Sequence, residues 1–191
     1  MSKRPIRRRP QRRAKASPTP SRSPKTPQPL TPFGRELTTK RRGEISELAF
    51  ALAAARHGFG IAKPFGDSER YDIILDPSHL PAPPTAPPNP DARPRLVRVQ
   101  VKSSTQLQNG LYHINAHRRI NGRAVPYKLS EIDFIVAYII PEDSWFILPL
   151  AHILGQTSLL FRPKRSPIPS PYNDYRESWH LLHQPDGLTF A

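Results

Sequence analysis

Polar side chains in two short, strand-like stretches have the types and the spacing that hydrolytic chemistry needs. In VQVK, residues 99–102, Gln100 and Lys102 alternate with valines, and in YDIILD, residues 71–76, Asp72 alternates with Tyr71 and Ile73. Side chains two positions apart on a strand share one face, about 7 Å apart, so Gln100 and Lys102 project together. Burial alone would not select these polar faces, which indicates that the residues have a chemical role.

A helix is predicted ahead of both stretches. Thr38 or Thr39 can cap its first turn, and Gly58 stands where a glycine just past a helix end is favoured. Glu47 lies within this helix, and the residues that follow it on its own face are apolar: Phe50, Ala51 and Ala54. A carboxylate in apolar surroundings needs a partner, which a bound cation or a lysine supplies. If the two strands are neighbours, this helix is expected to lie across them and bring Glu47 to their polar side chains.

Such a group of side chains would suit metal-assisted chemistry. The oxygens of Glu47, Asp72 and Gln100 are hard ligands of the kind that Mg²⁺ or Mn²⁺ prefers, and the Val101 main-chain carbonyl is a further candidate ligand. A lysine beside the metal, Lys102, can orient the attacking water and neutralise charge that builds on a phosphoryl oxygen. The sequence therefore predicts a phosphodiester-cleaving site with Mg²⁺ or Mn²⁺ as cofactor.

The elements that must position these residues follow from the pattern along the chain. Stretches rich in β-branched and aromatic residues, separated by turn residues, predict strands at 59–63, 71–76, 96–103, 111–115, 132–140 and 144–149. A last helix is predicted within NDYRESWHLLHQ, residues 173–184. Helix first, then mostly strands, then helix indicates an α/β (α+β) fold in which helices flank a mixed sheet.

The first helix is apolar on two sides. Opposite Phe50, Ala51 and Ala54 runs a second stripe at helical spacing, made of Ile45, Leu48, Ala49, Leu52 and Ala53. An α-helix that is apolar on both sides is expected to be covered on more than one side.

Positive charge is concentrated at the start of the chain. Residues 1–42 hold 14 of the 29 Lys and Arg residues but one of the 15 acidic residues, and the net charge of the whole chain is +14. We expect residues 1–37 to form a disordered, basic, proline-rich arm that contacts phosphates without reading bases. Residues 38–191 are then one folded domain, interrupted by a proline-rich loop at 77–94.

Other classes of protein are excluded by composition. The chain has no cysteine, which rules out disulfides, thiolate zinc sites and cysteine nucleophiles. No apolar run approaches the roughly 20 residues that a membrane helix needs, and no secretory signal is evident. The sequence predicts a soluble, cytoplasmic protein without a membrane partner.

The quoted motifs resemble a known family. The ordered set RRGEISEL, YDIILD and RVQVKSS is similar to the PD-(D/E)XK nuclease superfamily, in which a helical glutamate precedes a strand aspartate and a strand (D/E/Q)xK motif. The helix resembles that of archaeal Holliday junction resolvases, whereas the QxK variant resembles cyanobacterial-type group I intron homing endonucleases. The resemblance covers roughly residues 40–150.

The resemblance implies a restriction-endonuclease-like core and a Mg²⁺-dependent DNA endonuclease. It implies Glu47, Asp72 and Gln100 as metal ligands and Lys102 as the catalytic lysine, and it implies a homodimer or homotetramer, since cutting both strands with a single-site fold pairs two centres. A basic stretch around an Asn-Gly turn, with Arg118, Arg119 and Arg123, is expected to contact the DNA backbone.

Two further hypotheses remain open. The first is a catalytically inactive protein that keeps the nuclease fold and binds DNA through its basic arm. The second is a resolvase-like enzyme that acts on branched DNA. The three are distinguished by a divalent-metal cleavage assay on plasmid and four-way-junction substrates.

Overall fold

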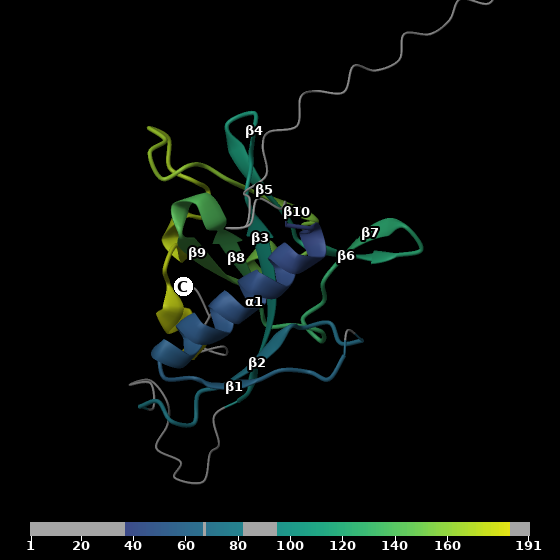
Figure 1. Ribbon diagram of the computed structural model, residues 1–191, viewed down its shortest axis with the longest axis vertical. Coiled ribbons are helices and arrows are strands. Elements are labelled where there is room, and N and C mark those ends of the chain that lie inside the picture. Colours follow the sequence, from purple (N-terminus) through teal and green to yellow (C-terminus); the bar gives the residue numbers. More distant parts are fainter. Residues whose placement is uncertain (1–36, 67, 82–94, 184–191) are drawn as a thin grey trace, which may run out of the picture.

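A mixed five-stranded sheet forms the centre of the molecule (Figure 1). The computed structural model describes residues 37–66, 68–81 and 95–183. The strand order is β1-β2-β3-β8-β9, in which β3 and β8 run parallel and the other neighbours antiparallel. The strands are β1 Gly60–Ala62, β2 Ile73–Asp76, β3 Val97–Ser104, β8 Phe134–Ile139 and β9 Ser144–Pro149. The predicted α+β class with a mixed sheet is confirmed.

Helix α1, Thr39–Arg56, lies across one face of this sheet (Figure 1). Thr38 caps it, because its hydroxyl oxygen accepts a hydrogen bond from the Arg41 main-chain N–H at 3.2 Å. The chain leaves the helix through Gly58, whose φ of +90° is a conformation that glycine adopts without strain.

The expectation that α1 is covered on more than one side is wrong for its larger apolar residues. The helix buries a narrow face made of Ser46, Phe50 and Ala54. The predicted stripe instead faces outward: Ile45, Leu48 and Leu52 are 40%, 62% and 56% exposed. Small residues on the buried face let the helix backbone approach the valines of β3 closely, and this contact leaves the leucines on the outer side.

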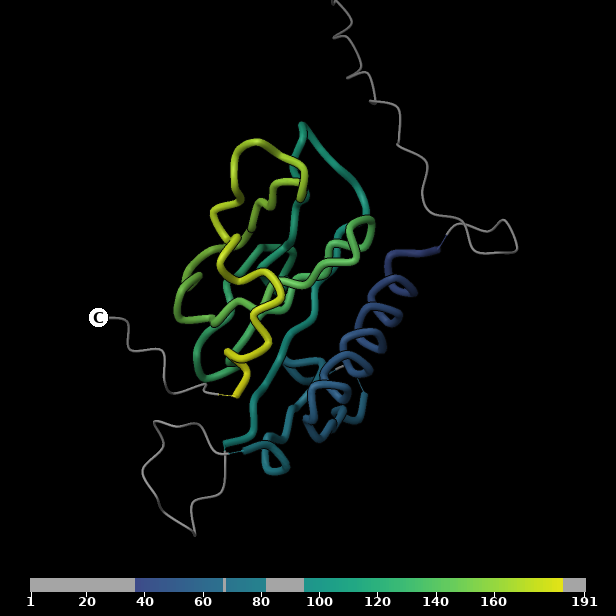
Figure 2. The backbone as a smooth tube through the Cα atoms, turned by 90° about the vertical axis from the view of Figure 1, so that its left-hand side faces the viewer, coloured from purple at the N-terminus to yellow at the C-terminus, as the bar shows by residue number. Residues whose placement is uncertain are grey.

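Two hydrophobic cores lie on opposite faces of the sheet. Figure 2 shows α1 along one side of it. The first core joins α1 to the sheet and contains Phe50, Val97, Val99, Trp145 and Trp179. The second packs β8 and β9 against a three-stranded sheet of order β10-β5-β4. Its strands are β4 Leu107–Gln108, β5 Leu111–Asn115 and β10 Ser158–Phe161.

Two hairpins project from this frame, as Figure 1 shows. Asn109 and Gly110 join β4 to β5, and Asn121 and Gly122 join β6, His117–Ile120, to β7, Arg123–Pro126. All four turn residues have positive φ, the property of the type I′ turns that Asn-Gly favours. Strands β4, β6, β7 and β10 were not predicted from the sequence.

The helix predicted within residues 173–184 is wrong. Short 3₁₀ segments occupy this region, η3 Asn173–Tyr175 and η4 Trp179–His183; two more, η1 Ile140–Glu142 and η2 Leu150–Ile153, flank β9. Glu177, at a φ of +53°, separates η3 from η4. Its carboxylate accepts hydrogen bonds from the Trp145 main-chain N–H at 2.7 Å and the Trp179 indole N–H at 3.0 Å. These bonds fix the segment against β9 in a conformation that a continuous helix cannot adopt.

Two predicted segments fall largely outside the structure: the arm up to residue 36 and the proline-rich loop from residue 82 to 94 lie outside the described residues. Within the described part of the chain, no helix combines the length and the apolar character needed to cross a membrane.

Candidate active site

Strands β2 and β3 are neighbours, as the sequence-based hypothesis requires. Ile73 pairs with Val99 in antiparallel register, and the main-chain N–H of Asp72 donates to the Val99 carbonyl at 2.9 Å. This register sets the Asp72 carboxylate beside the middle of β3. There it accepts hydrogen bonds from the Gln100 side-chain amide and, at 2.8 Å, from the Val101 main-chain N–H.

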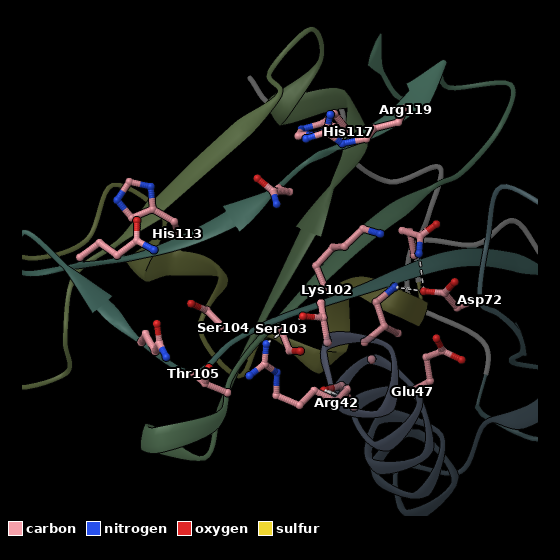
Figure 3. A pocket seen from close by; sticks show the side chains of 18 residues that line it. Arg42, Glu47, Asp72, Lys102, Ser103, Ser104, Thr105, His113, His117 and Arg119 are labelled. Carbon is pink, nitrogen blue, oxygen red and sulfur yellow. Dashed lines mark hydrogen bonds between the residues drawn. The ribbon is translucent and has the colours of Figure 1, made fainter. Parts of the chain in front are cut away.

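Glu47 reaches the same region from α1. Its carboxylate forms an ion pair with the Lys63 ammonium at 2.6 Å, just after β1. Figure 3 shows Glu47, Asp72 and Lys102 around one cleft, with Lys102 extending between the helix and the strands opposite. A lysine is thus the partner that Glu47 has in this structure.

The four predicted catalytic residues line a single cleft of about 520 Å³, together with Val101. The cleft lies between α1 and the β5–β6 segment. Its floor is the C-terminal half of β3, which continues past Lys102 to Ser103 and Ser104 (Figure 3). The structure therefore brings together residues that lie up to 55 positions apart in the chain.

Burial changes the electrostatics of the two central ionisable groups. It raises the pKa of Asp72 to about 6, an effect that the Val101 N–H and the Lys102 charge oppose. Burial also lowers the pKa of Lys102, against the carboxylates of Asp72 and Glu47, which raise it. A carboxylate whose charge burial disfavours gains from a bound cation, and a lysine whose pKa is lowered gives up a proton more readily.

Gln100 is held from both ends of its amide. Its nitrogen donates to Asp72, and its oxygen accepts a hydrogen bond from the Tyr127 hydroxyl at 3.2 Å. Tyr127 is buried, and burial together with the Asp72 charge raises its pKa to about 12, so it remains a donor at neutral pH. Sequence reasoning missed Tyr127, because no periodic pattern links it to β3.

The donor set suits a hard cation with several water ligands. Among the described residues, no three His, Cys, Asp or Glu side chains are grouped to hold a metal ion. Two carboxylates, Glu47 and Asp72, are available, with neutral oxygens from Gln100 and Val101 beside them. Mg²⁺ is commonly bound through one or two carboxylates while water completes its octahedron, so these residues fit it. Gln100 would have to turn its amide oxygen from Tyr127 to become a ligand.

The three predicted DNA-contacting arginines lie in different surroundings. Arg119 lines the cleft, whereas Arg123 is exposed on β7 outside it. Arg118 points the other way along β6 and pairs with Glu131 at 2.9 Å, with side chains 12% and 17% exposed. Strand alternation explains the difference, since His117 and Arg119 share the cleft face and Arg118 does not. Its position favours a structural role for Arg118, and His117 is a cleft residue that the sequence did not single out.

The Arg118–Glu131 pair leads to a stability prediction. Arg118→Ala is expected to lower the free energy of unfolding by about 1–2 kcal/mol, because it removes the ion-pair partner of the mostly buried Glu131 carboxylate, which keeps its hydrogen bond from the Lys128 main-chain N–H. Arg123→Ala, an exposed change on the same hairpin, is the control and should stay within about 0.5 kcal/mol. Urea unfolding measures both; equal effects would contradict the structural role of Arg118.

A helical glutamate, a strand aspartate and a QxK strand that meet on a mixed sheet define the PD-(D/E)XK class of nucleases. Sequence comparison agrees, because residues 37–80 and 90–182 match the PD-(D/E)XK endonuclease family, and the chain belongs to that family.

A solved structure is also similar. It is that of a bacterial homing endonuclease, I-Ssp6803I, which matches with a TM-score of 0.58 and 28% sequence identity. The match covers 77% of this chain and 92% of that one. Comparison with curated proteins found no match.

Proposed function

We propose that this protein is a DNA endonuclease that depends on a divalent metal ion. The observation that carries the proposal is the meeting of Glu47, Asp72 and Lys102 in one cleft, with Asp72 half-buried and oriented by two hydrogen bonds. Membership of the endonuclease family and the similarity to a homing endonuclease support DNA as the substrate.

Each residue has a distinct role in this mechanism. Glu47 and Asp72 would hold Mg²⁺ or Mn²⁺, with Gln100 and the Val101 carbonyl as neutral ligands. A bound ion supplies Lewis acidity toward a phosphoryl oxygen. Lys102 orients the attacking water and neutralises charge that develops on the scissile phosphate. Lys63 balances the charge of Glu47 before the ion arrives, since the two form an ion pair.

Metal removal tests the function directly. The purified full-length protein is expected to nick or cut DNA with Mg²⁺ or Mn²⁺ and to leave it intact in EDTA. Cleavage is measured on supercoiled plasmid, linear duplex and a four-way junction. A resolvase-like enzyme cuts the junction in preference, whereas a general endonuclease also cuts the plasmid and the duplex. Equal cutting with and without chelator would contradict the proposal.

A catalytically inactive DNA-binding protein is the second candidate, and Gln100 is the observation that favours it. A neutral amide stands where many relatives of this motif carry an acid, and it is already engaged with Asp72 and Tyr127. This lowers the negative charge available to a cation. Tight DNA binding without turnover at any Mg²⁺ or Mn²⁺ concentration would identify this function.

The basic arm is proposed to bind DNA through phosphates in either case. Deleting residues 1–36 removes 11 Lys and Arg residues. The logarithm of the DNA-binding constant is then expected to fall less steeply with the logarithm of salt concentration, by about 0.9 in slope for each phosphate that the arm neutralises. Deleting residues 184–191, which hold no Lys or Arg, is the control. An unchanged slope after the first deletion would exclude the arm as a DNA-binding element.

Oligomeric state completes the proposal. Cutting both strands of a duplex in one binding event pairs two centres, so we expect a homodimer or homotetramer, which light scattering of the full-length protein measures.

A further inference from the structure

The cleft extends well beyond the catalytic residues, and its outer part has a different chemistry. Among the described residues that line it, the acidic ones are Glu47 and Asp72, both at one end. Away from that end the lining is made of amide, hydroxyl, imidazole and guanidinium side chains, among them Arg42, Gln108, His113, Asn115, His117 and Arg119. Such a surface is suited to a polyanion that carries hydrogen-bonding groups.

The β4–β5 hairpin supplies the middle of this surface. Along β5, Tyr112 and Ile114 are buried in the second core, so the alternating residues His113 and Asn115 are exposed on the cleft side. Their side chains, and that of Gln108 on β4, make no hydrogen bond with another residue that the structure describes. Three polar groups are thus presented outward in a row by one short ribbon.

Strand β5 is held on both edges, because β4 pairs with one edge and β10 with the other. β10 pairs with β5 in antiparallel register, with Leu160 opposite His113 and Ser158 opposite Asn115. The two-residue Asn-Gly turn closes the hairpin without a flexible loop. A preorganised ribbon of this kind can present side chains at fixed positions, which recognition of a sequence requires.

Arginines border the ribbon on both sides of the cleft. Figure 3 shows Arg42 on the α1 side and His117 and Arg119 on the opposite side, with Lys102 between them. His117 is held in place because its Nδ1 lies 2.7 Å from the Thr157 carbonyl oxygen. Guanidinium groups contact phosphates, whereas Asn, Gln and His side chains of this geometry can hydrogen-bond base edges.

We propose that the β4–β5 hairpin enters the major groove of duplex DNA and reads base edges through Gln108, His113 and Asn115. Arg42 and Arg119 contact the flanking phosphates. This inference rests on the proposed function for its substrate class. The tip of the hairpin, where Gln108 pairs with Leu111 beyond the end of β10, is a two-stranded ribbon of the kind that fits the major groove, which is about 12 Å wide. The continuous cleft would place the bases that are read beside the bond that is cut.

Sequence preference is the readout that tests the proposal. The full-length protein and the His113→Ala/Asn115→Ala variant are incubated with a randomised duplex library and Mg²⁺, and the cut ends are sequenced. The variant is expected to lose about tenfold discrimination at a few adjacent base pairs and to keep cutting. Since both side chains are exposed and point away from the second core, the variant should fold normally, which its melting temperature verifies.

Two matched variants separate base reading from other effects. Arg119→Ala should weaken binding to all DNA sequences alike and make binding less dependent on salt concentration. Its preference among DNA sequences should not change. His180→Ala, an exposed histidine that is not part of the cleft lining, should behave as the unmodified protein. An unaltered preference in His113→Ala/Asn115→Ala, or a protein without any preference, would overturn the proposal.

A binding selection without metal keeps the two proposals distinguishable. Duplexes retained by the protein in EDTA are sequenced for the same set of variants. If nothing is cut but the bound sequences show a preference that His113→Ala/Asn115→Ala loses, the nuclease proposal fails and the ribbon proposal stands. If cutting occurs and the preference is unaffected by the substitutions, the ribbon proposal fails alone.

Discussion

Lys102→Ala is expected to lose at least about 10²-fold in DNA cleavage rate while it binds DNA nearly as well as the unmodified protein. The reason is that Lys102 lines the same cleft as Glu47 and Asp72 and interacts electrostatically with both, so that its charge can act on the scissile phosphate. Binding draws on many cations, so the loss of one buried ammonium changes affinity little. Single-turnover cleavage with Mg²⁺, alongside filter binding in EDTA, measures the two quantities separately.

Lys102→Met separates charge from packing in this experiment. Methionine keeps much of the aliphatic stem of lysine. If the lysine charge is what supports cleavage, Lys102→Met should lose as much activity as Lys102→Ala. Lys164→Ala, an exposed lysine outside the cleft, should retain full activity. If Lys102→Ala cuts DNA as fast as the unmodified protein, the catalytic role of this lysine is excluded.

Asp72→Asn is expected to have opposite effects on stability and on activity. Asparagine can still accept hydrogen bonds from Gln100 and the Val101 N–H, but it removes a charge that burial disfavours. A pKa raised from 3.8 to about 6 corresponds to about 1–3 kcal/mol at neutral pH. The metal-free variant should therefore be more stable than the unmodified protein by up to this amount, and DNA cleavage should fall by about 10²-fold or more.

The stability difference between Asp72→Asn and the unmodified protein depends on pH, because the pKa of Asp72 is raised in the folded state. Because the folded state holds the Asp72 proton more tightly, the contribution of Asp72 to stability is full below pH 3.8 and is lost as pH rises through about 6. The extra stability of metal-free Asp72→Asn should thus be largest at pH 7 and should vanish near pH 4. Mg²⁺ should raise the melting temperature of the unmodified protein more than that of the variant. Equal melting temperatures at pH 7 without metal would show that Asp72 is not desolvated.

Local patterns predicted which side chains share a face, and the structure supplied the adjacency. Strand alternation placed Gln100 and Lys102 on one face, and the Thr38 or Thr39 cap located the helix that carries Glu47, whereas the pairing of β2 with β3 was a condition that the structure meets. These features depend on backbone geometry over a few residues, which a single sequence records. Tyr127 was missed because its hydrogen bond to Gln100 depends on how a distant loop packs.

The wrong predictions have long-range causes as well. The apolar stripe of α1 could not reveal which side meets the sheet, and the small residues near Phe50 decided it by allowing close approach. The C-terminal helix is replaced because Glu177 bonds to β9, an interaction outside any local window. Arg118 and Arg119 could have been told apart from the sequence once Asn121 and Gly122 are read as a hairpin turn, since alternation then assigns them to opposite faces.

The two hydrophobic cores have a consequence for how this nuclease changes over time. Helix α1, which carries Glu47, and strands β2 and β3 pack in the first core, whereas β5 rests on the second through Tyr112 and Ile114. His113 and Asn115 contribute to neither. If His113 and Asn115 read bases as proposed, replacements at these two positions can accumulate without loosening the packing that holds Glu47, and lineages descended from one ancestor can diverge in the DNA they target.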